Sequence, residues 1–100
     1  MPYRPLRLCR QGGGFEALPD GRRSLDLGRV RQALERAGVS VVDARVLLIA
    51  ATDPEVTISR AGRLLFKTSE LARAARLLDW LLALEPLGEK DRRDRGSAPP

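Results

Sequence analysis

Cys9 is the residue of this sequence best suited to covalent chemistry, because Arg7 and Arg10 stand close to it along the chain. Neighbouring cations lower the pKa of a thiol, and the thiolate is the nucleophilic form. One interpretation is therefore a reactive thiol that acts as an accessory in sulfur transfer. The other is a small apolar residue of the core. The sequence favours the second, because no general base or second cysteine accompanies Cys9.

Other residue types used in catalysis and metal binding are missing or scattered. The 100 residues include no histidine, which removes the usual general base near neutral pH and the commonest metal ligand. Four acidic residues stand singly, without the spacing of a paired-carboxylate or metal site: Asp43, Asp53, Glu55 and Asp79. We therefore expect a protein that is not an enzyme, with no catalytic residue, metal or cofactor.

The excess of positive charge lies toward the amino terminus. The net charge is +5, and five arginines stand against two carboxylates among residues 1–23. These arginines are candidate phosphate contacts of a small basic nucleic-acid-binding domain: Arg4, Arg7, Arg10, Arg22 and Arg23. The centre of the chain is nearly neutral and offers few aromatic side chains for base stacking. Nucleic-acid binding is therefore the alternative function.

The spacing of apolar residues divides the chain into short strands and two helices. Strands are predicted at residues 3–10, 39–42, 46–51, 56–59 and 64–67, with a further short one at 15–18. The first helix is predicted to begin after Ser24 or Asp26, either of which can cap it, and to end before Gly38. The second helix is predicted over about residues 70–85. Gly62 suits a hairpin turn between the strands at 56–59 and 64–67. This order predicts an α+β fold. We expect a single antiparallel sheet of four to five strands with two helices packed on one face, in a β-α-β-β-β-β-α order similar to a TATA-binding-protein repeat.

The second predicted helix carries apolar residues on more than one face. Its core stripe is expected to be Leu71, Ala75, Leu78 and Leu82. A second set on the adjoining faces is the candidate interaction surface: Leu77, Trp80, Leu81 and Leu84. Either the amino-terminal segment folds over this set, or a protein partner or second copy binds it. Exposed apolar patches mark association, and Trp is a favoured anchor.

Residues 1–88 are predicted to form one domain, followed by a charged tail at residues 89–100. The tail carries almost no apolar residue, so we expect it to be disordered. The start of the chain is basic but lacks the apolar segment of a secretory signal, and no apolar run reaches the length of a membrane span. The sequence therefore predicts a cytoplasmic protein without membrane contact.

Three segments carry a resemblance to a known family. They are Leu8–Arg10, Leu25–Leu27 together with Leu34, and residues 54–74. Together they resemble the carboxy-terminal module of ubiquitin-activating-like adenylyltransferases of the ThiF/MoeB/HesA family. The chain does not include the adenylation domain of that family, its glycine-rich nucleotide loop or its zinc-binding cysteine pairs. The resemblance implies a detached module that recognises a ubiquitin-like sulfur-carrier protein or docks to an adenylating enzyme, and activates nothing itself.

The leading hypothesis is a non-catalytic protein-interaction module, either as an accessory of such a system or as a homodimer. Burial of the apolar surface of the second helix would drive the association. The alternative is the basic nucleic-acid-binding domain, whose phosphate contacts would make binding fall steeply with added salt.

Overall fold

Six strands and two helices make up the fold. The computed structural model describes residues 3–9, 13–84 and 87. The strands are β1 (Arg7–Leu8), β2 (Phe15–Ala17), β3 (Val41–Asp43), β4 (Leu47–Ala50), β5 (Val56–Ser59) and β6 (Leu64–Phe66). The helices are α1 (Leu27–Arg36), between β2 and β3, and α2 (Leu71–Leu82), after β6. The predicted α+β class is confirmed, whereas Arg10 and the predicted tail at residues 89–100 lie outside the described residues.

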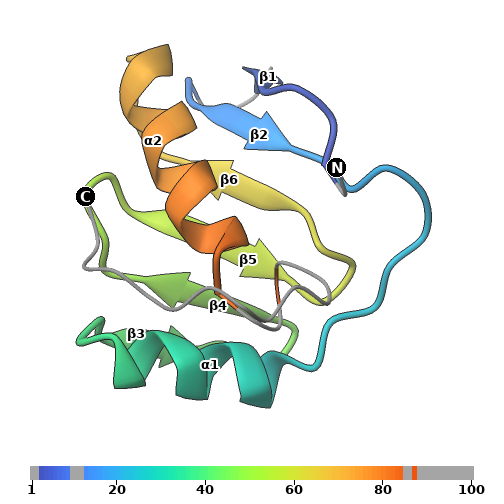
Figure 1. Ribbon diagram of the computed structural model, residues 1–100, viewed down its shortest axis with the longest axis vertical. Coiled ribbons are helices and arrows are strands. Elements are labelled where there is room, and N and C mark those ends of the chain that lie inside the picture. The colour runs from blue at the N-terminus through green and yellow to red at the C-terminus, as the bar shows by residue number, and fades with distance from the viewer. Residues whose placement is uncertain (1–2, 10–12, 85–86, 88–100) are drawn as a thin grey trace.

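All six strands belong to one antiparallel sheet with the order β1-β2-β6-β5-β4-β3 (Figure 1). Strand β2 joins the amino-terminal hairpin to β6, with Phe15 opposite Phe66 and Ala17 opposite Leu64. The expected count of four to five strands is too low. The segment at residues 15–18 was predicted only as a further short strand, because three residues are too few for periodicity to establish a member of the sheet. The three residues of β2 are all buried.

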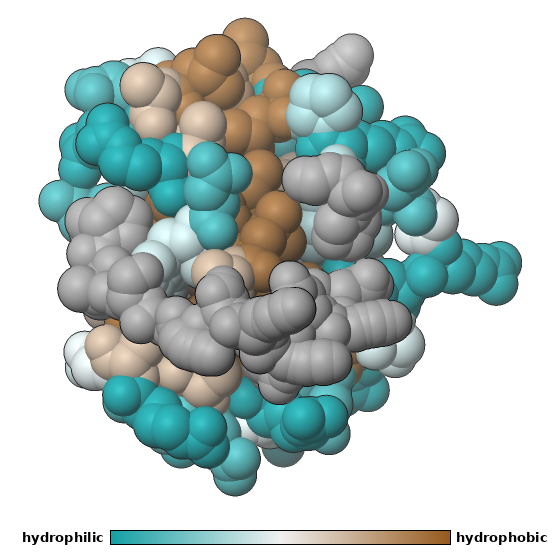
Figure 2. Space-filling view, viewed as in Figure 1, coloured by the Kyte–Doolittle hydropathy of each residue, from teal (hydrophilic) through white to brown (hydrophobic). Residues whose placement is uncertain are grey.

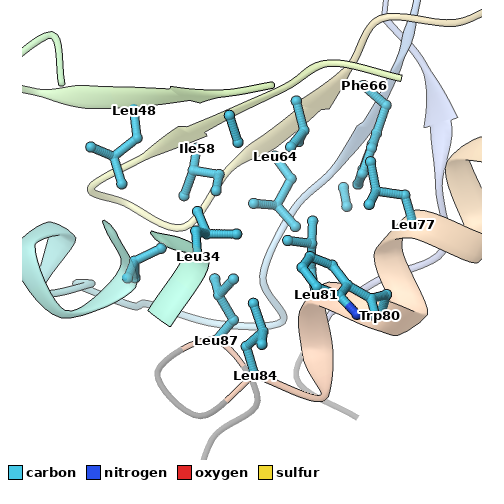
Figure 3. Close-up of a cluster of buried hydrophobic side chains, with 14 of the residues drawn as sticks. Leu34, Leu48, Ile58, Leu64, Phe66, Leu77, Trp80, Leu81, Leu84 and Leu87 are labelled. Carbon is cyan, nitrogen blue, oxygen red and sulfur yellow. The ribbon is translucent and has the colours of Figure 1, made fainter. Parts of the chain in front are cut away.

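Both helices pack on the same face of the sheet, α2 across the strands and α1 along β3 and β4 (Figure 1). Leu34 of α1 and Leu81 of α2 are fully buried in one cluster with Ile58 and Leu64 of the sheet (Figure 3). Exposure alternates along β4, because the pleat sends alternate side chains to opposite faces. Within the described residues, the opposite face of the sheet carries no helix.

The turns and helix ends follow from local sequence. The Asp26 carboxylate accepts hydrogen bonds of 3.1 and 3.3 Å from two backbone N–H groups in the first turn of α1, so Asp26 is its cap. Gly38 follows α1 with a φ of 89°, and Gly62 takes a φ of 93° in the β5–β6 hairpin. A side chain is disfavoured at both positions. The predicted roles of these three residues are confirmed.

The amino-terminal segment is fixed to the β5–β6 hairpin. Tyr3 Oη donates a 2.6 Å hydrogen bond to the carbonyl oxygen of Gly62, and its burial raises the pKa of the hydroxyl. The Arg23 guanidinium lies over the Tyr3 ring, 5.6 Å from the centroid, and its Nη2 donates a 2.9 Å hydrogen bond to the carbonyl oxygen of Leu87. Residues from both ends of the described chain thus meet beside this hairpin.

Candidate functional site

The four residues predicted as an interaction surface on α2 and just after it are in the core instead. Their exposed fractions are 1% for Leu77, 7% for Trp80, 0% for Leu81 and 9% for Leu84. Figure 3 shows them in the cluster that α1 and the sheet complete. This prediction is therefore wrong, because side chains buried to this degree in the folded monomer leave little area for a partner to cover.

The stripe expected to face the core lies on the flank of α2 instead. Leu71 is 53% exposed, and the other three residues of the stripe are half-buried. We call this set the outer stripe: Leu71, Ala75, Leu78 and Leu82. Figure 2 shows an apolar band that runs along α2 on the helix side of the molecule. Because Leu78 and Leu82 also touch the core, the outer stripe is a continuation of the core to the surface.

The rotation of α2 about its axis is fixed by contacts distant in sequence. Near its start, Nη2 of Arg73 lies 2.5 Å from Oδ1 of Asp53 in the β4–β5 turn. At 100° per residue, Arg73 lies about 200° around the helix from Leu71. The ion pair therefore turns Leu71 away from the β4–β5 turn. Near the end of the helix, Trp80 fills space in the core, which fixes the same rotation.

Charged residues border the outer stripe on its solvent side. Arg76 and Asp79 are exposed, and neither forms an ion pair with another residue of the described chain. Arg76 directly follows Ala75 and Asp79 directly follows Leu78, so each lies about 100° around the helix from a residue of the stripe. The surface therefore combines an apolar centre with a charged border, which is the usual composition of a protein interface.

A second surface lies on the sheet face that no described helix covers. Alternation along β2 places Glu16 on this face, with Arg7 on β1 at one side and Arg63 at the other. Glu16 is only 7% exposed. Arg7 Nε donates a 2.7 Å hydrogen bond to its carboxylate, and Arg63 donates another of 2.9 Å. Together they hold the pKa of the Glu16 carboxyl below its usual value, with the bond from Arg7 the larger cause.

The predicted arginine cluster is divided among different contacts. Arg4 and Arg22 are exposed, Arg7 is bound to Glu16, and Arg23 lies on Tyr3. Arg10 is outside the described residues. The structure adds Arg63, which is not among the five predicted contacts and which also contacts Glu16. Nucleic-acid binding stays a prediction, with two of its five proposed contacts engaged by the protein itself.

Cys9 lies at the end of the same sheet face and is half-buried. Its Sγ is 3.8 Å from Nη2 of Arg63, a cation that lies 54 positions away in the sequence. Within residues 3–9, 13–84 and 87, no three Cys, Asp or Glu residues are grouped as a metal site. Reactivity of this thiol stays a prediction.

Neither described helix combines the length and the apolar character that crossing a membrane requires. The outer stripe and the Arg7–Glu16–Arg63 group are two candidate recognition surfaces among the described residues. We compared the chain with protein-family models, with curated proteins and with solved structures, and none of them matches it.

Proposed function

We propose that this chain is a non-catalytic protein-interaction module that binds through the outer stripe of α2. The observation that carries the proposal is the exposure of Leu71 at the end of a continuous row of apolar side chains. A row of this kind on a helix is typical of helix-mediated recognition, which uses residues at intervals of three and four. No charged residue interrupts the row between Leu71 and Leu82 on this side of the helix.

Burial of the stripe supplies the driving force. Apolar surface removed from water contributes about 25 cal/mol per Å², from which the cost of association must be subtracted. Leu78 and Leu82 are already packed against the core, so little side-chain entropy is lost when a partner covers them. We therefore expect reversible binding in which Leu78 lies at the centre of the contact area and Leu71 enlarges that area.

The sequence resemblance suggests the class of partner. A ubiquitin-like sulfur-carrier protein, or the adenylating enzyme that serves it, would be the protein that binds the stripe. This part of the proposal depends on the three resembling segments alone. Purified proteins of either class can be offered to the chain directly, and binding that needs Leu71 would support it.

The test of the proposed function is site-specific photo-crosslinking in the cells that make the protein. A photoreactive residue replaces Ala72, which is exposed and adjacent to Leu71. We expect a covalent adduct that disappears when Leu71→Glu is added. This substitution keeps the helix start favourable, because a carboxylate suits the first turn of a helix. The matched control is Val42→Glu on β3, since Val42 is 61% exposed on another element.

The control should leave the adduct unchanged. Absence of any adduct from position 72 would overturn the proposal. So would an adduct that persists after Leu71→Glu, because it would show that contact at α2 does not use the stripe.

A further inference from the structure

We infer that the end of the sheet that carries the β5–β6 hairpin binds the phosphate backbone of a nucleic-acid duplex. This surface is separate from the outer stripe, so the inference goes beyond the proposed function and does not depend on it. Four exposed arginines from separate parts of the chain lie at this end: Arg4, Arg22, Arg45 and Arg60. Figure 1 shows the β5–β6 hairpin, the β3–β4 turn and the segment between β2 and α1 at the same end of the sheet.

Arg45 and Arg60 lie on adjacent turns. The N–H group of Arg60 donates a 3.3 Å hydrogen bond to the carbonyl oxygen of Val46, the residue after Arg45. Arg45 has a φ of 73°, a left-handed conformation that a bulky side chain rarely adopts. Its N–H group donates a 2.9 Å hydrogen bond to the Asp43 carboxylate, which holds the turn in this form. An arginine thus occupies a position that suits glycine, which we attribute to a function of its side chain.

Arg4 and Arg22 lie on the other side of the hairpin. The N–H group of Arg4 donates a 2.9 Å hydrogen bond to the carbonyl oxygen of Leu18, so Arg4 continues the line of β1 beside that of β2. Arg22 directly precedes Arg23, whose guanidinium covers the Tyr3 ring beside the hairpin. The four arginines therefore extend from the line of β1 to the turn between β3 and β4. This row spans between four and five strand spacings, or about 20 Å.

The positive charge of this row is not balanced within the described part of the chain. None of the four arginines forms an ion pair with a described residue. The Asp43 carboxylate pairs with Arg31 of α1 at 3.5 Å instead. Asp20 is exposed nearby, and the Asp26 carboxylate caps α1. Two carboxylates against four guanidinium groups leave a positive excess, which a bound polyanion would balance.

The length of the row and the burial of the aromatic residues favour a duplex. A row of about 20 Å matches the phosphates of about six base pairs, at about 3.4 Å for each. All four aromatic residues of the sequence are buried: Tyr3, Phe15, Phe66 and Trp80. A single strand would therefore find no aromatic side chain on which to stack its bases. A duplex needs none, and it presents the phosphates of two strands to the arginines.

A lipid surface fits this end of the sheet less well. Proteins that lie on a membrane bury a continuous apolar face beneath their cations. The exposed large apolar side chain beside these arginines is Val46, which stands alone in its turn. We therefore expect the duplex as the ligand, bound without preference for sequence, because contacts to phosphates carry no sequence information.

The experiment is a titration of labelled DNA and RNA duplexes of about 20 base pairs with the full chain, read as fluorescence anisotropy at several salt concentrations. Each phosphate contact contributes about −0.9 to the slope of log K against log salt. Four contacts predict a slope of about −3.6, which is about a hundredfold loss of affinity between about 50 and 200 mM salt. Arg45→Gln combined with Arg60→Gln should halve the slope and reduce that loss to about tenfold.

The matched control removes two charges at the opposite end of the sheet. Helix α1 and strand β6 both end on the side away from the hairpin, close to Arg36 and Lys67 (Figure 1). Arg36→Gln combined with Lys67→Gln lowers the net charge by the same amount and should leave the slope unchanged. A slope that changes only in the hairpin variant would locate the contacts at the row.

Arg45→Gly separates binding from folding. It removes the guanidinium and also suits the positive φ, so the unfolding temperature should stay the same or rise. The salt slope should nevertheless become shallower by about 0.9. A stable Arg45→Gly chain with the wild-type slope would contradict the role given to Arg45.

Three further results would overturn the inference. One is a wild-type chain that binds neither duplex at low salt. Another is an equal loss of slope in the two double variants, because net charge and not this row would then attract the duplex. The third is displacement of the duplex by polyglutamate, by vesicles that contain phosphatidylserine or by a single strand as effectively as by unlabelled duplex. None of these results affects the crosslinking expected at position 72, so the proposed function stands or fails separately.

Discussion

Arg63 binds Glu16 across the β2–β6 pair, with both Nε and Nη2 of the guanidinium 2.9 Å from the same carboxylate oxygen. The residues are 47 positions apart in the sequence. Arg7 takes the other oxygen from the opposite side. The side chains of Arg7 and Arg63, which are 63% and 47% exposed, cover a Glu16 side chain that is only 10% exposed. Charge-assisted hydrogen bonds of this kind favour the ionised form of the acid.

Glu16 should make stability depend on pH in the acid range. Its pKa is lower in the folded protein than in the unfolded chain, where a Glu titrates near about 4.3. The stabilisation is therefore present above that pH and is lost as the pH falls through the folded pKa. Glu16→Gln should lower the free energy of unfolding at neutral pH. The free energy of unfolding of this variant should also fall less steeply than that of the wild type below about pH 4.3. Urea unfolding at several pH values measures both effects.

The control for this prediction is Glu35→Gln. Glu35 pairs with Arg31 at 3.2 Å on the exposed side of α1, and ion pairs exposed to this degree contribute little. Its pH profile should remain close to that of the wild type. A Glu16→Gln protein with an unchanged profile would show that the two arginines do not stabilise the carboxylate.

Gly14→Ala should destabilise the fold strongly. A Cβ atom at this position would overlap the backbone carbonyl oxygen of Phe66, which β6 holds in the sheet. Either β2 or β6 must then move, at a cost of about 1–3 kcal/mol or more. Thermal unfolding should show a clear fall in the midpoint temperature.

Gly28→Ala is the matched change on α1. Its Cβ would meet only Asp26 Oδ1, at 3.4 Å, and alanine favours a helix over glycine by about 1 kcal/mol. This variant should be as stable as the wild type or more so. Equal stability of the two alanine variants would contradict the close approach of β2 to β6.

Trp80→Ala should destabilise the monomer instead of acting only on assembly. Trp80 is almost completely buried, and loss of a core aromatic side chain costs about 3–5 kcal/mol. Leu71→Ala, on the same helix but largely exposed, should change the free energy of unfolding by no more than about 0.5 kcal/mol. Urea unfolding of both variants compares how much the buried face and the exposed face of α2 contribute to the free energy of unfolding. Similar losses in the two variants would mean that the helix is rotated differently.

Local structure could be predicted well from the sequence because its causes are local. A carboxylate at Asp26 can reach the N–H groups two and three residues further on, whatever surrounds the helix. Gly38 and Gly62 are suited to a positive φ by their lack of a side chain. Strand β5 was predicted with its observed bounds, since its alternation of apolar and polar residues is regular.

The candidate site could not be predicted in the same way. Around α2, apolar residues occur on so many faces that periodicity alone assigned the wrong stripe to the core. The pairing of Arg73 with Asp53 and the packing of Trp80 decide the rotation, and both depend on how distant segments meet. The covering of Glu16 by Arg63 has the same origin.

The sequence by itself thus determined which segments become strands and helices, where several of them begin and end, and that residues suited to catalysis are scarce. Those properties depend on residue types and on neighbours a few positions away. Only the tertiary structure decided that β2 joins the sheet beside β6 and that Leu71, not Trp80, reaches the solvent. The reason is that a helix with apolar residues on several faces could bury any of them with a similar gain in free energy. Packing against the rest of the chain selects the face that is buried.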